Sequence, residues 1–127
     1  MAKKILVVDD EPNIRLFLKS RLKANNYDVI TAENGKECLK KVVSEKPDLI
    51  ILDIMMPEMD GYSTLIAMKE MREIDEEMPT PHIIVLSARA DPGVRDLVEK
   101  EEIDSYITKP FKAEDLLERI RKIFEEE

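Results

Sequence analysis

Five short runs of β-branched and other apolar residues recur along the chain, and a segment with helical spacing follows each run. In the first such segment Ile14, Leu18 and Leu22 are four positions apart, which places them on one stripe of a helix. Strands that alternate with helices predict a parallel sheet covered on both faces, because parallel strands need a crossover connection. The predicted strands are 4–8, 28–32, 48–52, 82–87 and 105–109.

The same alternation restricts the topology. Crossovers between parallel strands are right-handed, so the simplest arrangement is a doubly wound α/β fold, a three-layer sandwich of five strands and five helices. Pro12, "ENG" at 33–35 and "DG" at 60–61 suit helix starts or turns. The remaining apolar stripes are Leu39, Val42 and Val43; Leu65, Met68 and Met71; and Leu116, Ile120, Ile123 and Phe124.

Composition excludes several classes of protein. The 127 residues suit one domain, which we expect to span 1–127. No apolar run is long enough to cross a membrane, and acids interrupt the apolar start too early for a signal peptide. A single cysteine, Cys38, rules out an internal disulfide framework. The net charge of -8 argues against direct nucleic-acid binding. These features predict a cytoplasmic protein.

Polar side chains stand where the predicted strands end. Asp9 and Asp10 follow the first strand, Asp53 ends the third, and Ser87 and Lys109 end the fourth and fifth. In an open α/β sheet, ligands bind beyond the carboxyl ends of the strands, where the winding reverses. If the strand order is 2-1-3-4-5, the first and third strands are neighbours and the three acids converge at that point.

Each of these residues also has a purely structural interpretation. Asp9 or Asp10 could cap the helix that starts near Pro12, and Asp53 could cap the following loop. Ser87 and Lys109 could be ordinary strand-end residues. Three carboxylates at one edge would repel one another and raise one another's pKa, and a bound Mg²⁺ would remove that conflict because it prefers carboxylate, water and phosphate oxygens.

The motifs "VVDDE", "LIILDIMMPEMDG", "VLSA" and "YITKPF", in this order and spacing, resemble the receiver domain of bacterial two-component response regulators, including the chemotaxis regulators. The resemblance covers about Lys4 to Glu125. It implies a flavodoxin-like fold with strand order 2-1-3-4-5. It also implies a cytoplasmic signalling switch that is not an enzyme in the ordinary sense, although it catalyses its own phosphorylation and dephosphorylation.

The resemblance assigns the chemistry to particular residues. Asp53 matches the phosphoacceptor, which takes a phosphoryl group from the phosphohistidine of a histidine kinase. Asp10 matches a direct Mg²⁺ ligand and Asp9 an acid that holds the metal mainly through water, while Asp53 and the backbone carbonyl of Met55 complete the protein ligands. Lys109 matches the lysine that pairs with carboxylate or phosphoryl oxygens.

Four further positions follow from the same resemblance. Ser87 matches the hydroxyl that turns toward the phosphoryl group, and Tyr106 the aromatic residue that swings inward with it. Pro110 matches the proline whose peptide bond with the preceding lysine is cis. Met55 and Arg89 occupy the two positions that influence dephosphorylation. The implied partners are a sensor histidine kinase or phosphotransfer protein, and a downstream effector or an output domain outside this chain.

Two other functions remain open at this point. A Mg²⁺-dependent phosphohydrolase for small molecules would need a second acid where Met55 stands, and a flavin or nucleotide binder would need a Ser/Thr- or Gly-rich phosphate loop after the first strand. One departure from the family is also visible. Many receivers place Gly-Ala before the fifth strand, whereas this chain has Glu102-Ile103 after an acidic helix end, "EKEE" at 99–102. We therefore expect the fourth helix to end differently.

Overall fold

The computed structural model describes residues 2–56, 59–88 and 92–127. Within these residues five strands alternate with five helices. Three predicted strands have the expected bounds, while the third is shifted by one residue and the fifth ends one residue early. The elements are β1 (Lys4–Val8), α1 (Pro12–Ala24), β2 (Asp28–Ala32), α2 (Gly35–Glu45), β3 (Leu49–Asp53), α3 (Gly61–Ile74), β4 (His82–Ser87), α4 (Pro92–Glu99), β5 (Ser105–Thr108) and α5 (Ala113–Glu125).

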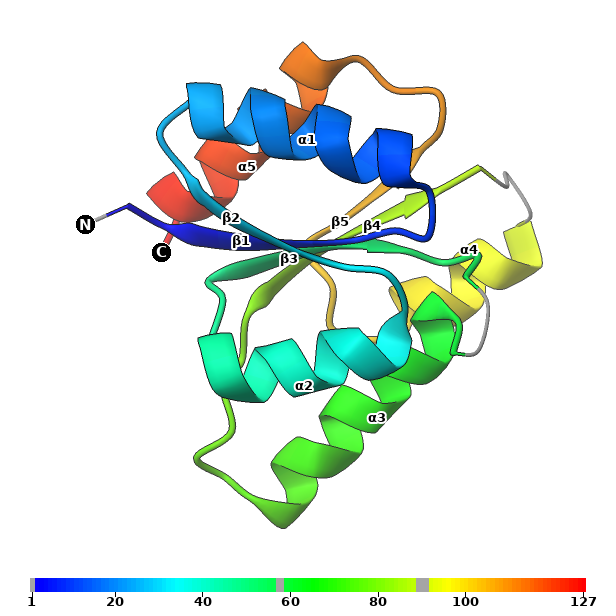
Figure 1. The fold of residues 1–127 in the computed structure, drawn as a ribbon. Helices are drawn as coiled ribbons and strands as arrows, with labels where there is room; N and C mark the ends of the chain where they lie inside the picture. Colours follow the sequence, from blue (N-terminus) through cyan, green and yellow to red (C-terminus); the bar gives the residue numbers. More distant parts are fainter. Residues whose placement is uncertain (1, 57–58, 89–91) are drawn as a thin grey trace.

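The strands form one parallel sheet in the order β2-β1-β3-β4-β5, which confirms the predicted topology. Helices α1 and α5 cover one face of this sheet, and α2 and α3 cover the other (Figure 1). The third strand lies at the centre, paired with β1 on one side and β4 on the other. All the carboxyl ends of the strands therefore meet at one edge, and the winding reverses between β1 and β3.

Two apolar cores separate the layers, one on each face of the sheet. Alternate residues of a strand enter different cores: Leu6 and Ile50 pack beneath α2 and α3, whereas Ile5 and Ile51 pack beneath α1 and α5. This is the two-residue period of a strand buried on both faces. The central strand β3 is buried along its whole length, so Asp53 is held by a rigid backbone.

The helix stripes fit the structure with one exception. Leu18, Leu22, Met68 and Ile120 are buried as predicted. Val43, however, is 47% exposed, so its assignment to the apolar stripe of α2 is wrong. Cys38 and Val42 already fill that side of the helix.

The starts of the helices show which capping predictions hold. The side chains of Asn34 and Asp60 cap α2 and α3 by accepting bonds from the N–H groups of Glu37 and Ser63. Neither Asp9 nor Asp10 caps α1, whose N-cap residue is Glu11 with no side-chain hydrogen bond. The capping interpretation of the first acid pair is therefore wrong.

The shift of β3 is accompanied by a contact with the distant start of β1. The Asp48 carboxylate accepts a hydrogen bond from the N–H of Lys4 at 2.8 Å, so Asp48 anchors the start of the strand from outside it.

Across residues 2–56, 59–88 and 92–127, no helix combines the length and the apolar composition that a bilayer span requires.

Candidate functional site

The acids of the first and third strands converge at the carboxyl edge of the sheet. Asp9, Asp10 and Asp53 each offer a carboxylate oxygen, and these oxygens all lie within 4.8 Å of one another. Asp9 and Asp53 are only 1% and 4% exposed, whereas Asp10 is exposed. Their convergence follows from the direct pairing of β1 with β3.

Lys109 supplies a positive charge to this cluster. Its Nζ lies 3.0 Å from Asp9 Oδ2 and 3.8 Å from Asp53 Oδ1. The lysine therefore pairs more closely with Asp9 than with the expected phosphoacceptor. Its position is fixed from β4, because the backbone N–H of Lys109 donates to the carbonyl of Ser87 at 2.7 Å.

The environment of Asp53 disfavours its ionised form. Burial and the neighbouring charge of Asp9 raise the pKa of Asp53 to about 6, although Lys109 and the N–H of Met55 act in the opposite direction. That N–H donates to Asp53 Oδ1 at 3.3 Å. For Lys109, burial works against the ammonium, but the hydrogen bond to Asp9 and the charges of Asp53 and Asp9 raise its pKa. The site therefore holds excess negative charge in its ionised state.

This donor set suits a hard divalent cation. Three carboxylates that meet at the carboxyl ends of neighbouring strands, one of them exposed, can bind Mg²⁺ and leave its other positions to water or phosphate oxygens. Such an ion would also offset the burial and the repulsion from Asp9 that together raise the pKa of Asp53.

Ser87 and Tyr106 lie on neighbouring strands. Ser87 ends β4 and is completely buried, and Tyr106 pairs in register with Val85 of that strand. The Tyr106 ring is partly buried and packs against the core beneath α2 and α3. The guanidinium of Arg95, on α4, lies 5.1 Å from the centre of the ring.

Other predicted positions have different outcomes. The Lys109–Pro110 peptide bond is cis, the isomer that the resemblance implies. Met55 follows the third strand and its side chain is 50% exposed. Arg89, which the resemblance links to dephosphorylation, lies outside the described residues.

Two residues that support the site were not identified from the sequence. A Cβ at Gly61 would lie 2.5 Å from the backbone oxygen of Asp53, so this glycine lets the start of α3 approach the end of β3. Arg15 donates from Nη1 to the carbonyl of Asp9 at 2.6 Å and lies 3.6 Å from Glu33. The "DG" pair marked Gly61 only as part of a helix start or turn, and no local pattern marked Arg15.

Two potentially reactive residues lie away from the site. His82 begins β4 as predicted, at the amino ends of the strands and so opposite the site. Its ring nitrogens lie 3.0 Å and 2.9 Å from Asp104 and Glu127. Cys38 is buried, and burial raises its thiol pKa to about 12. A thiol with that pKa is unreactive at neutral pH.

Comparison with known proteins identifies a family whose members this chain resembles over most of its length. The family model described as the response regulator receiver domain matches residues 5–121. The chain is 42% identical over 123 residues to the alkaline phosphatase synthesis transcriptional regulatory protein PhoP of Bacillus subtilis, covering 97% of this chain and 49% of PhoP. The chain thus spans about half the length of the curated relatives it matches.

Solved structures agree with this match. A CheY-like response regulator receiver domain protein from Methanospirillum hungatei superposes with a TM-score of 0.86 at 29% identity, covering 99% of this chain and 96% of that one. The response regulator TrrA of Thermotoga maritima, solved in complex with Mg(2+)-BeF, has a TM-score of 0.77 at 40% identity, covering 94% and 97%.

Proposed function

Because this chain belongs to the receiver-domain family of two-component response regulators, we propose that Asp53 is its phosphoacceptor and that phosphorylation switches a partner-binding face. One observation carries the proposal: the buried Asp53 carboxylate lies 3.8 Å from Lys109, with its ligand oxygen within 4.8 Å of those of Asp9 and Asp10. A structural aspartate at the end of a buried strand has no need of this surplus of acids. We also propose that residues 1–127 act as a single receiver unit.

The chemistry is a phosphoryl transfer. A carboxylate oxygen of Asp53 attacks the phosphorus of a phosphohistidine on a sensor kinase or phosphotransfer protein, the P–N bond breaks, and the imidazole leaves with its electron pair and takes up a proton. The product on this chain is an acyl phosphate. Such a transfer depends mainly on positioning and on charge neutralisation, which the rigid end of β3 and the Lys109 ammonium provide.

Asp9, Asp10, Asp53 and the backbone carbonyl of Met55 are the groups that would hold Mg²⁺. When bound, the ion supplies positive charge against the carboxylates and the phosphoryl oxygens. Lys109 then has two tasks: it offsets the charge of Asp9 before transfer and pairs with a phosphoryl oxygen afterwards. Its 3.0 Å contact with Asp9 keeps its ammonium at the mouth of the site.

Ser87 and Tyr106 connect this chemistry to a surface. A hydroxyl drawn from Ser87 toward the phosphoryl group leaves space that the ring of Tyr106 fills, because the two residues lie on paired strands. This change shifts the equilibrium between two packing arrangements of the face formed by α4, β5 and α5. The partner on that face is an effector protein or an output domain.

The hydrolase alternative has no comparable support. Its second acid would stand at position 55, where the exposed side chain belongs to a methionine, which cannot act as a general acid or base. The chain is a signalling module rather than an ordinary enzyme.

The phosphorylation test uses acetyl phosphate with Mg²⁺, followed by intact mass measurement. The wild-type chain should gain one phosphoryl group and Asp53→Asn should gain none, because an amide is a poor nucleophile. Asp28→Asn, at an exposed position of β2, is the matched control and should label normally. Labelling of Asp53→Asn at the wild-type rate would remove Asp53 from this role.

The metal assignment has its own test. Asp10→Ala should weaken Mg²⁺ binding at least tenfold, measured by calorimetric titration, yet should leave stability in EDTA unchanged or higher because one repelling charge is gone. Unchanged Mg²⁺ affinity in this variant would place the ion elsewhere.

A further inference from the structure

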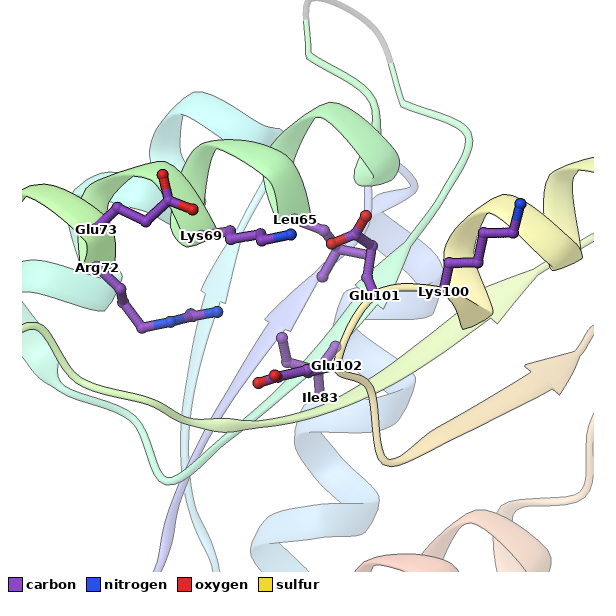
Figure 2. Close-up of a pocket in the computed structure, with 8 residues that line it drawn as sticks. All are labelled: Leu65, Lys69, Arg72, Glu73, Ile83, Lys100, Glu101 and Glu102. Atoms are coloured by element: carbon purple, nitrogen blue, oxygen red, sulfur yellow. The ribbon is translucent and has the colours of Figure 1, made fainter.

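A hollow of about 330 Å³ lies between α3 and the connection from α4 to β5 (Figure 2). It is not lined by any of the site residues Asp9, Asp10, Asp53, Ser87 and Lys109. Its floor is apolar, formed by Leu65 and Ile83, each 4% exposed. The rest of the lining is charged, with three cations and three acids: Lys69, Arg72, Glu73, Lys100, Glu101 and Glu102.

The sequence builds each wall separately. Leu65, Lys69 and Arg72 recur at spacings of four and three, so they share one face of α3. The opposite wall is the departure from the family pattern. No glycine ends α4 there. Instead, the N–H of Lys100 donates to the backbone carbonyl of Asp96 and the N–H of Glu101 to that of Val98, and the acidic segment forms the rim of the hollow.

The charges face one another across the hollow. In Figure 2, Lys69 and Arg72 extend from α3 into it, and the carboxylates of Glu101 and Glu102 extend back from the other wall. Throughout the described part of the chain, no ion pair of 4.0 Å or less joins these two walls. Groups of opposite sign thus face a shared space above an apolar floor.

We propose that this hollow binds a small zwitterion, of the class of a short peptide with free termini. At about 330 Å³, the hollow lies at the lower end of the roughly 300–1,000 Å³ typical of small-molecule sites, which suits a ligand of dipeptide size. The ligand carboxylate pairs with Lys69 and the planar fork of Arg72. Its ammonium pairs with Glu101 and Glu102, and its aliphatic part covers Leu65 and Ile83.

The two walls together define the class of ligand. In Figure 2 the charged ends of Glu73 and Lys100 point away from the hollow. A simple anion is therefore attracted by Lys69 and Arg72 but repelled by Glu101 and Glu102, and a simple cation meets the reverse. Only a molecule that carries both charges gains at both walls, so the discrimination arises from repulsion as much as from attraction. The site is partly open to water and its charged lining is mostly exposed, so we expect millimolar affinity.

The test is a titration of the isotope-labelled full chain with glycyl-leucine, followed by amide chemical shifts. Saturable shifts at residues of α3, the start of β4 and the α4–β5 connection are expected. Two blocked analogues keep the same frame: N-acetyl-glycyl-leucine retains only the anion, and glycyl-leucinamide retains only the cation. Each should bind at least tenfold more weakly.

Variants separate this hollow from general charge effects. Lys69→Met and Glu101→Gln should each weaken glycyl-leucine binding at least fivefold. The exposed positions Lys36 and Glu76 provide matched controls, and Lys36→Met and Glu76→Gln should bind as the wild type does. Circular dichroism verifies that all four variants are folded.

Three outcomes would overturn the proposal: no saturable shift at these residues, equal binding of either blocked analogue, or undiminished binding by both hollow variants. None of them bears on the phosphorylation of Asp53, since none of the site side chains lines the hollow.

Discussion

The cost of ionising Asp53 in the folded protein makes a sharp stability prediction. Burial and the charge of Asp9 raise its pKa from the ordinary 3.8 to about 6. A carboxyl whose pKa is higher in the folded state destabilises that state once it is ionised. The substitution Asp53→Asn removes the charge and keeps the shape, so without metal it should stabilise the protein at neutral pH.

The size of this effect follows from the pKa. At about 1.36 kcal/mol per pKa unit, a rise from 3.8 to about 6 sets an upper limit of about 3 kcal/mol. Solvent and salt at the mouth of the site screen the repulsion, and the Asn variant loses the attraction of Lys109 at 3.8 Å. We therefore expect a gain of about 1–2 kcal/mol, or roughly 4–8 °C in Tm for a domain of this size.

The pH dependence gives the prediction its sign. Between about pH 4 and pH 6 the folded Asp53 holds a proton that the unfolded chain has released, so its contribution to stability falls as the pH rises through this window. Below pH 4 both states are protonated and the advantage of the Asn variant should vanish. Above about pH 7 the advantage should be complete and constant.

The assay is urea unfolding in EDTA, followed by circular dichroism from pH 4 to pH 8, for the wild type, Asp53→Asn and the exposed control Asp28→Asn. Saturating Mg²⁺ should reduce or reverse the difference, because the wild type binds the ion with an extra carboxylate. An Asn variant no more stable than the wild type at pH 7.5 in EDTA would refute the reasoning. So would an advantage of equal size at pH 4 and pH 7.5.

Three further predictions concern the surroundings of the site. Gly61→Ala should lower the free energy of unfolding by about 1–3 kcal/mol in urea, because its Cβ would lie 2.5 Å from a backbone oxygen; stability within about 0.5 kcal/mol of wild type would mean that α3 can shift without cost. Ser87→Ala should still be phosphorylated with acetyl phosphate, but the amide chemical shifts of β5 and α5 should remain those of the unphosphorylated protein. If these shifts change on phosphorylation as they do in the wild type, Tyr106 responds without the hydroxyl. The phosphorylated wild type should decay slowly, because the apolar Met55 cannot orient an attacking water, and Met55→Asn and Arg89→Ala should both accelerate decay in a mass-spectrometric time course; unchanged decay in both would show that these positions do not limit hydrolysis.

Much of the fold could be predicted from the sequence because its signals are local. Apolar runs of strand length, helical spacing and turn residues such as Asn34 and Asp60 act over a few neighbouring residues, and three of the five strands have the predicted bounds. The bounds that differ depend on distant partners: β3 begins after Asp48, whose carboxylate binds the N–H of Lys4.

The candidate site could be predicted in part. The positions of Asp9, Asp53 and Lys109 at strand ends, together with the topology, were enough to expect their convergence. The sequence could not reveal that Lys109 lies nearer to Asp9 than to Asp53, nor that Gly61 must lack a side chain. Both depend on distances between segments far apart in the chain.

The sequence by itself therefore determined which elements form and which chemical groups stand at their ends, because both follow from short-range pattern. The tertiary structure alone decided how strongly those groups perturb one another. The raised pKa of Asp53 and the facing charges of Lys69 and Glu101 arise from burial and from spacing across the packed layers, and neither quantity exists until the chain has folded.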